Sequence, residues 1–288
     1  MKRPALTYAF LPHEEIRRGF VRILGEIPAC GRDLARRSRK PAGELIHEGR
    51  LLIKRMRALL WFARDAVGFA AYAHARAQLR SAAALLSDQR DLGVTRATLE
   101  QLARKVLNPR DRTAVRQVAR RLVGKATAGG VSAKALREEL HKAMTILDRS
   151  ADEIQRSATD RAAWPSPSER LAKAFRATRQ AGKRARRTGK DTDFHEWRKK
   201  AKRLLYQLEL TQPEPGRQMA RVKKRVEKLQ SILGDYHDGV VAGSRLRQMI
   251  PVPASARRVV LLLEKRKARL RKKACKLAVK ALSRFGPG

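Results

Sequence analysis

The sequence predicts an all-α protein, and three observations lead to that fold class. Ala, Leu, Arg, Lys and Glu, which favour helices, fill long segments of the 288-residue chain. No segment keeps the apolar–polar alternation that a half-buried strand needs. Each break in the helical pattern contains Pro or Gly. Hydrophobic residues make up 43% of the chain, which excludes a disordered basic tail and allows a packed core.

The helices are expected in the segments between these breaks. They cover residues 13–26, 43–64, 70–87, 90–104, 111–124, 132–157, 167–187, 193–211, 215–233, 235–248 and 254–284. The breaks read "IPACG", "LNPRD", "TAGGVS", "WPSPS", "TQPEPG" and "IPVPAS". The best mid-chain boundary is "WPSPSE", at Trp164–Glu169, where Ser168 is expected to cap the next helix.

One basic helix pattern occurs twice. It reads "IHEGRLLIKRMRALL" from Ile46 and "DFHEWRKKAKRLLYQLEL" from Asp193 to Leu210. The residues that recur at an offset of 148 positions (195 − 47) are His47, Glu48, Arg50, Lys54 and Arg55, which match His195, Glu196, Arg198, Lys202 and Arg203.

A second motif follows each copy in the same order. "LLSDQRDLGV" resembles "ILGDYHDGVV", so that Asp91 matches Asp238, although Arg90 stands where the later copy has His237. Two linked matches predict an internal duplication. We therefore expect a single domain over residues 1–288, with a first helical half at 1–163 and a second at 164–288.

Helical spacing places the cations of both copies beside the apolar face. At about 100° per residue, the core face of the second copy holds Phe194, Trp197, Ala201, Leu204, Leu205 and Leu208, and that of the first holds Ile46, Gly49, Ile53, Met56 and Leu60. The adjoining flanks hold His195, Arg198, Lys199, Lys202 and Tyr206, and His47, Arg50, Lys54 and Arg57. Arg203 is expected to point further outward.

A cation beside the core is partly enclosed by neighbouring helices, where several like charges are costly without an anion. Because the flank repeats along the helix with a step of about 5 Å, it suits a ligand that carries negative charges in a row. Two such helices, related by duplication, could line a shared groove.

The histidine of the second copy is expected near the helix start. Asp193 and Glu196 have the spacing of a capping box, which would put His195 in the first turn. A bound anion there would favour protonated imidazole. The alternative is a neutral histidine that is hydrogen-bonded to a carboxylate of the other motif.

The charge balance points to a polyanionic partner. Lys and Arg number 67 and Asp and Glu 27, a formal net charge of +40. Nucleic acid, an acidic membrane surface and inorganic polyphosphate are the candidates. Aromatic residues are only 5% of the chain, which gives few platforms for base stacking. No zinc-finger or RNP-type motif occurs, so nucleic-acid binding is the alternative interpretation.

The cysteines and the apolar segments indicate the cellular compartment in which the protein is expected. Cys30 and Cys275 are isolated and have no CxxC spacing, so we expect reduced thiols and no structural zinc. The beginning of the chain lacks the apolar run of a secretory signal, and no apolar run is long enough to span a bilayer. A cytoplasmic protein is expected. The amphipathic segment 254–284 is interpreted as packing on the bundle, with Arg271 as a peripheral cation; membrane-surface binding is the alternative.

The paired motifs carry a family resemblance. "HEGRLLIKRMRALL" and "HEWRKKAKRLLYQLEL" resemble the two signature helices of the CHAD family, the conserved histidine α-helical domain. "RDLGV" and "GDYHDGVV" resemble the motif that follows them. The resemblance covers nearly the whole chain, and "ERLAKAFRATRQAGKRARR" is also similar to a basic family segment, although Arg179-Gln180-Ala181 depart from its usual pattern.

The resemblance implies two pseudo-symmetric four-helix bundles with additional helices and a basic central cavity that binds inorganic polyphosphate. It also implies association with polyphosphate granules and leaves the oligomeric state open. The polyphosphate-facing residues that it implies are His47, Arg50, Lys54, Arg57, Arg176, Lys183, His195, Arg198, Lys199, Lys202 and Tyr206.

Asp91 and Asp238 allow two interpretations. As structural residues they would pair with Arg or His, or cap a helix. As catalytic residues they could bind Mg²⁺ for phosphoryl transfer. We favour the structural role, because the sequence shows no dense acidic cluster and no ExExK motif of the partner domain often fused to this family. We therefore expect a binding protein with no catalytic residues, no metal site and no cofactor.

Overall fold

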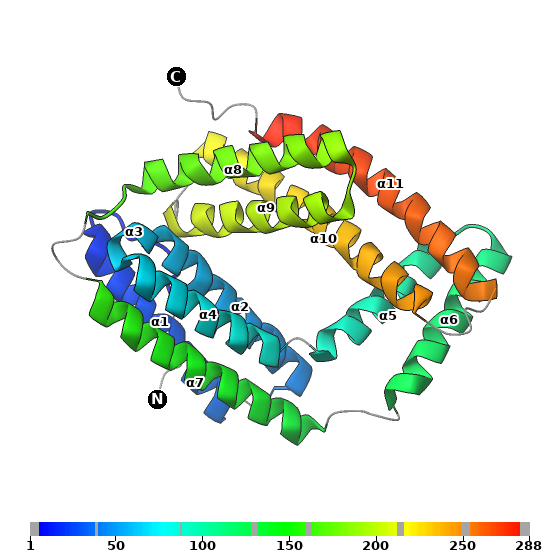
Figure 1. Ribbon diagram of the computed structural model, residues 1–288, viewed down its shortest axis with the longest axis horizontal. Helices are drawn as coiled ribbons and strands as arrows, with labels where there is room; N and C mark the ends of the chain where they lie inside the picture. The colour runs from blue at the N-terminus through cyan, green and yellow to red at the C-terminus, as the bar shows by residue number, and fades with distance from the viewer. Residues whose placement is uncertain are drawn as a thin grey trace. The chain divides into compact units, whose positions relative to one another are not determined.

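The computed structural model describes residues 6–37, 40–86, 88–127, 132–158, 163–211, 216–248 and 254–282, without the side chains of residues 37, 88–92 and 123–127. Every helix in these ranges is an α-helix, and they contain no strand, which confirms the all-α prediction (Figure 1). The helices are α1 Ile16–Arg37, α2 Ala42–Phe62, α3 Arg64–Val67, α4 Phe69–Leu85, α5 Asp88–Lys105, α6 Pro109–Thr127, α7 Ala133–Ser157, α8 Pro167–Thr188, α9 Asp191–Thr211, α10 Arg217–Arg247 and α11 Ala254–Leu282.

The chain forms two compact units that are interleaved along the sequence. Unit 1 comprises Met1–Asp88, Val131–Ala174 and Arg203–Arg217, and unit 2 comprises Gln89–Gly130, Phe175–Lys202 and Gln218–Gly288. Helices α8 and α9 therefore each contribute to both units. The compact units do not coincide with the predicted halves 1–163 and 164–288. The duplication and the basic central cavity stay predictions.

Unit 1 is a four-helix bundle of α1, α2, α4 and α7. Helix α7 packs on α1, α2 and α4, and α2 also packs on α1 and α4 (Figure 1). Phe20, Phe62, Leu79 and Leu147 are fully buried in its core, and Leu210 of α9 joins them. Complete burial of such side chains supplies about 1.5–3 kcal/mol each.

Glycine lets α2 and α7 approach closely. A Cβ atom at Gly49 would lie 2.6 Å from Cδ1 of Leu140 on α7. The first repeated helix therefore uses its glycine on the core face, as its spacing predicts.

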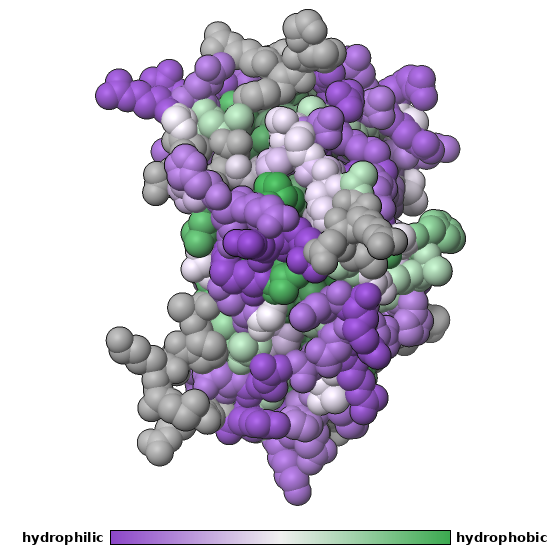
Figure 2. All heavy atoms as spheres, turned by 90° about the vertical axis from the view of Figure 1, so that its left-hand side faces the viewer, coloured by the Kyte–Doolittle hydropathy of each residue, from purple (hydrophilic) through white to green (hydrophobic). Residues whose placement is uncertain are grey.

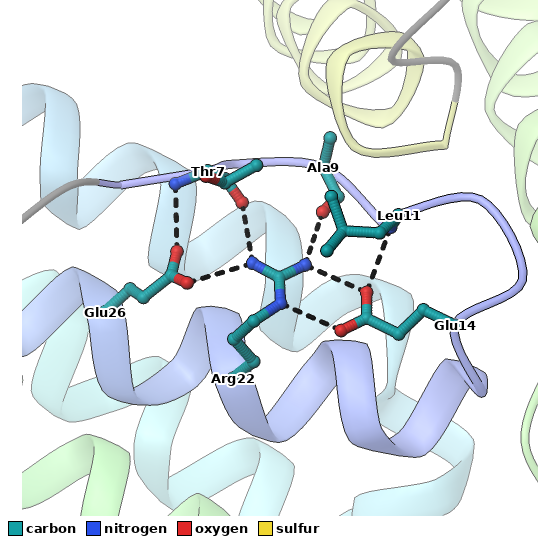
Figure 3. A network of polar contacts seen from close by, with 6 residues as sticks. All are labelled: Thr7, Ala9, Leu11, Glu14, Arg22 and Glu26. Atoms are coloured by element: carbon teal, nitrogen blue, oxygen red, sulfur yellow. Dashed lines mark hydrogen bonds and ion pairs between the residues drawn. The ribbon is translucent and has the colours of Figure 1, made fainter.

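Arg22 of α1 fastens the N-terminal segment to the bundle (Figure 3). Its guanidinium donates hydrogen bonds to both carboxylate oxygens of Glu14, at 2.8 and 2.9 Å, and to Glu26 at 3.0 Å. It also donates to the backbone carbonyls of Thr7 and Ala9. The hydrogen bonds from Arg22 lower the pKa of Glu14, and those to Glu14 and Glu26 raise the pKa of Arg22.

In unit 2 one core cluster joins α5, α6, α10 and α11. Its completely buried residues include Leu99, Val115, Leu246, Val259 and Leu263. This burial confirms that α11 packs on other helices, as the pattern of segment 254–284 predicts.

A second packed region of unit 2 surrounds the start of α9. The ring of Phe194 lies 4.7 Å from that of Tyr236 on α10. Asp191 accepts hydrogen bonds from the Tyr236 hydroxyl and from Nζ of Lys267, the latter at 2.8 Å. Burial alone would raise the pKa of Asp191, but these hydrogen bonds lower it. Arg271 lies over the Phe194 ring at 5.4 Å, so this cation of α11 contacts the packed region.

Two expected breaks do not occur. Helix α1 continues through Pro28, although "IPACG" predicts an end there. The flanking Ile23, Ile27 and Leu34 are buried in unit 1, and this burial offsets the hydrogen bond that the proline removes. Helix α10 continues through Gly234, where two helices are expected.

Two predicted caps are also wrong. Helix α8 is capped by Ser166 instead of Ser168: the Ser166 hydroxyl accepts from the Glu169 amide at 3.2 Å, and Glu169 accepts from the Ser166 amide. Pro167 then takes the first helical position, which suits it because it has no N–H.

Helix α9 begins at Asp191, two residues before the expected cap. Gly189, with a φ of 66°, reverses the chain so that α9 runs back along α8 (Figure 1). Asp193 is buried and accepts from the Thr188 hydroxyl at 2.6 Å. His195 therefore lies just beyond the first turn.

The face drawn in Figure 2 is mostly hydrophilic, with small apolar areas between charged side chains. Among the described helices, none combines the length and the apolar character that a membrane span requires.

Candidate anion-binding site

The first repeated helix presents its flank along α2. His47 is exposed, whereas Arg50 and Lys54 are half-buried. Arg50 donates a hydrogen bond to the carbonyl of Leu86, the C-cap residue of α4, so this cation also helps to cap α4.

Further along α2, arginines from several elements of unit 1 gather near Trp61. The guanidinium carbons of Arg203, Arg170 and Arg64 lie 4.9, 5.8 and 5.9 Å from the indole ring centre. Such distances allow cation–π attraction. We call this group, together with the arginines that act on it electrostatically, the Trp61 arginine cluster; it consists of Arg57, Arg64, Arg76, Arg80, Arg170 and Arg203.

The cluster is partly neutralised at one end. Asp65 forms ion pairs with Arg170 at 2.7 Å and with Arg64 at 3.0 Å. Burial would raise the pKa of Asp65, but the two arginines lower it. Arg170 is only 3% exposed, so its charge depends on this carboxylate.

The other end is crowded with positive charge. Partial desolvation lowers the pKa of Arg57, and the charges of Arg76 and Arg80 lower it further, although all three residues are exposed and water screens their repulsion in part. Burial also lowers the pKa of Arg203, to which Arg76 and Arg57 add. Among the described groups that shift these two pKa values, none is a carboxylate. Arginine stays protonated all the same, so an anion that bound here would relieve a repulsion already present.

Tyr206 is placed differently from the implied ligand-facing position. It is 9% exposed and belongs to the core of unit 1, where its ring meets the edge of the Tyr8 ring at 6.4 Å. This burial favours a packing role. Arg203, expected to point outward, is half-buried against Trp61, because the C-terminal part of α9 packs within unit 1.

In unit 2 the flank of α9 packs on α10. The Nδ1 atoms of His195 and His237 are 3.2 Å apart, and their ring centres 4.5 Å. One turn further, Nε of Arg198 lies 4.0 Å from the position of a Cβ at Gly234. His195 thus meets a histidine of the second motif, and this contact replaces the expected bond to a carboxylate.

The surroundings of His195 disfavour its protonation. Burial lowers its pKa most, followed by the charges of Lys199 and Arg198, while Glu196 acts in the opposite direction. Glu196 is itself held by Lys199 at 2.6 Å. A bound anion would reverse this balance.

The remaining predicted residues differ in their exposure. Lys202 and Asp238 are half-buried, and the side chains of Arg90 and Asp91 lie outside the described residues. Arg176 and Lys183 of α8 are exposed. Lys183 lines an apolar cavity with Trp197, and no described contact joins it to the His195 flank. In the described part of the chain, no three His, Cys, Asp or Glu side chains gather as a metal site would require.

Sequence reasoning missed Arg76, Arg80 and Trp61. A signal was present in "AHARAQLR", where the two arginines of α4 are four residues apart and share one helix face. Their position next to α2 and α9 follows only from packing.

Comparison with known proteins agrees with the repeated motifs. The family model of the CHAD domain matches residues 28–247, which include both histidine-led helices and both Asp-containing motifs. Two curated relatives, the uncharacterized proteins MT2285 and Rv2226 of the Mycobacterium tuberculosis strains CDC 1551 and H37Rv, are each 28% identical over 219 residues. The match covers 73% of this chain and 41% of each relative, so the chain spans less than half of their length. The chain belongs to the CHAD domain family.

Proposed function

We propose that this protein binds inorganic polyphosphate through the exposed and half-buried cations of its histidine-led helices, without catalysing a reaction. The observation that carries the proposal is the Trp61 arginine cluster, where Arg57 and Arg203 are crowded by other arginines with no carboxylate among the described groups that shift their pKa values. Such a cluster costs free energy until a polyanion occupies it.

Arginine and lysine would share the binding. Guanidinium groups donate two parallel hydrogen bonds to one phosphate, and lysines act as point charges. Of the residues that the family implies, Tyr206 is packed in the core of unit 1 and Lys183 lines an apolar cavity, so we leave these two out. The residues proposed for contact are His47, Arg50, Lys54, Arg57, Arg176, His195, Arg198, Lys199 and Lys202, to which we add Arg76, Arg80 and Arg203.

Nucleic acid is the competing ligand, because the same cations bind its phosphates. The Trp61 ring is not accessible for stacking with a base, because the residue is 5% exposed and guanidinium groups lie close to its ring. A flexible chain of phosphates without bases can follow an arginine cluster that runs from half-buried Arg203 to exposed Arg57, Arg76 and Arg80 better than a duplex, whose phosphates are held on a wide helix.

Competition tests the proposal. Long-chain polyphosphate, RNA and duplex DNA of matched total charge are titrated against the protein at low and at near-physiological salt. We expect polyphosphate to win by a large factor that persists at the higher salt, although all affinities fall with salt. If the three polyanions compete equally and all dissociate, the net charge alone explains binding and the proposal fails.

Association with polyphosphate granules in the cytoplasm follows from this proposal. A fluorescent fusion should collect on granules in cells that store polyphosphate and spread evenly in cells that lack it. The same fusion with Arg57 and Arg203 changed to Glu should stay diffuse in both.

A further inference from the structure

Unit 2 contains an apolar cavity, and an apolar surface is of no use for binding polyphosphate. Helices α8, α9 and α11 line a half-open cavity of about 160 Å³. Its floor is apolar, with Trp197 of α9 and Ala278 of α11. Its rim carries Arg179, Lys183 and Arg186 of α8, and none of the described residues that line it is acidic.

The indole of Trp197 supplies an unused hydrogen-bond donor. The side chain is 1% exposed, and its Nε1 has no hydrogen-bond partner among the described residues. The indole edge that carries Nε1 lies against Gly182, where a Cβ would come within 2.8 Å of Cε2 and 3.0 Å of Nε1. Gly182 also lines the cavity. A buried donor without an acceptor costs about 1–3 kcal/mol.

The α11 side of the cavity is neutral. Cys275 lines it, and burial raises the pKa of this half-buried thiol, so that it stays protonated and behaves as a small apolar group. Val279, which is 59% exposed, extends the apolar wall toward solvent. An alkyl chain would therefore find apolar contacts along α9 and α11, and an anionic group would find only cations along α8.

We propose that this cavity binds a small amphipathic anion, a carboxylate that carries one short alkyl chain. The chain packs against Trp197 and Ala278, and the carboxylate is held by the rim cations Arg179, Lys183 and Arg186. An oxygen that enters beside Gly182 accepts a hydrogen bond from the indole N–H. A dry apolar cavity of comparable volume holds a ligand about as large as benzene, so the cavity accommodates about six carbons of the chain, and the rest of a slightly longer chain extends along Val279 toward solvent.

Polyphosphate is a poor occupant of the same cavity. Its charged oxygens would lose water against an apolar floor that offers one N–H in return. The proposal goes beyond the proposed function, although Lys183 was assigned to polyphosphate by family resemblance. In the cavity, Lys183 would instead contact the carboxylate of the amphipathic ligand.

The reactivity of Cys275 reports occupancy. In the Cys30→Ser variant, Cys275 is the sole thiol, and its rate of modification by a neutral maleimide is followed in the presence of octanoate, octanol or octyltrimethylammonium, each below its micelle concentration. We expect saturating octanoate to slow the reaction about tenfold or more, octanol to slow it less, and the cation to leave it unchanged. Equal protection by octanoate and the cation, or protection by none, overturns the proposal.

Two variants separate occupancy from altered folding. Ala278→Phe fills the cavity and should abolish the effect of octanoate while circular dichroism and the melting temperature stay close to those of the parent. Arg186→Glu should weaken octanoate but not octanol. If both variants leave octanoate protection unchanged, the ligand binds elsewhere and the proposal is wrong.

Polyphosphate provides the control that keeps the two proposals apart. It should leave the Cys275 rate unchanged, and Arg203→Glu should leave octanoate protection intact. If the protein does not bind octanoate but binds polyphosphate normally, only the cavity proposal fails. If it binds octanoate but does not bind polyphosphate, only the proposed function fails.

Discussion

Arg22 and Arg203 are both arginines of unit 1, and their surroundings are opposite. Arg22 has the carboxylates of Glu14 and Glu26 and two backbone carbonyls as acceptors, which raise its pKa. Arg203 has the charges of Arg76 and Arg57 beside it, and burial together with these charges lowers its pKa. The first arginine stabilises the fold, whereas the second is the one that we propose meets an anion from outside. A count of positive charges does not distinguish them, but their acceptors do.

Removal of Arg22 should cost the most stability. Arg22→Met leaves two carboxylates and two carbonyls without their donor, and we expect a loss of about 2–3 kcal/mol after allowance for partial exposure. Arg203→Met removes a repulsion together with the cation–π contact to Trp61, so we expect a change of at most about 1 kcal/mol in either direction. Urea denaturation of both variants measures the difference. Equal destabilisation would contradict the comparison.

Reversal of Arg203 should affect the ligand instead. For Arg203→Glu we expect the Kd for polyphosphate to rise about thirtyfold, roughly 2 kcal/mol. Arg149→Glu, on an exposed position of α7, changes the net charge equally and should have an effect of about twofold or less. Calorimetric titration at near-physiological salt compares them. The same loss in both variants would mean that diffuse charge holds the ligand.

Lysines of the repeated flanks should matter less than the arginine cluster. We expect Lys54→Glu and Lys202→Glu each to weaken polyphosphate binding about tenfold. Arg271 is unsuitable as the control because it packs on Phe194 and Tyr236, so the exposed Lys272 of α11 takes its place. If Lys272→Glu weakens binding as much as the flank variants do, the flanks have no special role.

The histidine contact should give the smallest effect, and it depends on pH. Because the pKa of His195 is lowered in the unliganded fold, the neutral form is favoured, and the stability that this contributes is lost as pH falls below about 6.5 toward the lowered value. A bound polyanion favours the protonated form, so the affinity should rise a few-fold between about pH 8 and about pH 5.5. His195→Gln should flatten this dependence. An unchanged pH profile in that variant would exclude His195 as the titrating group.

Much of the fold could be predicted from local pattern. The helix positions, the Pro- and Gly-containing connections and the two histidine-led flanks follow from periodicity and from turn residues. The errors arose where packing overrides a local signal or where a competing local signal was overlooked. Pro28 reads as a break, but Ile27 beside it is completely buried and the helix continues. Ser168 reads as a cap, but Ser166 has the three-residue spacing to Glu169 that completes the hydrogen bonds.

The sequence by itself determined the all-α class, the excess of positive charge and membership in the CHAD family, because these depend on composition, period and motif. Only the tertiary structure decided which cations have carboxylate partners. Arg57 and Arg76 are far in sequence from Arg203, yet their charges add to the effect of burial and lower its pKa. The interaction of charges depends on distance in space and on burial, and neither is written in the spacing of residues along a single helix.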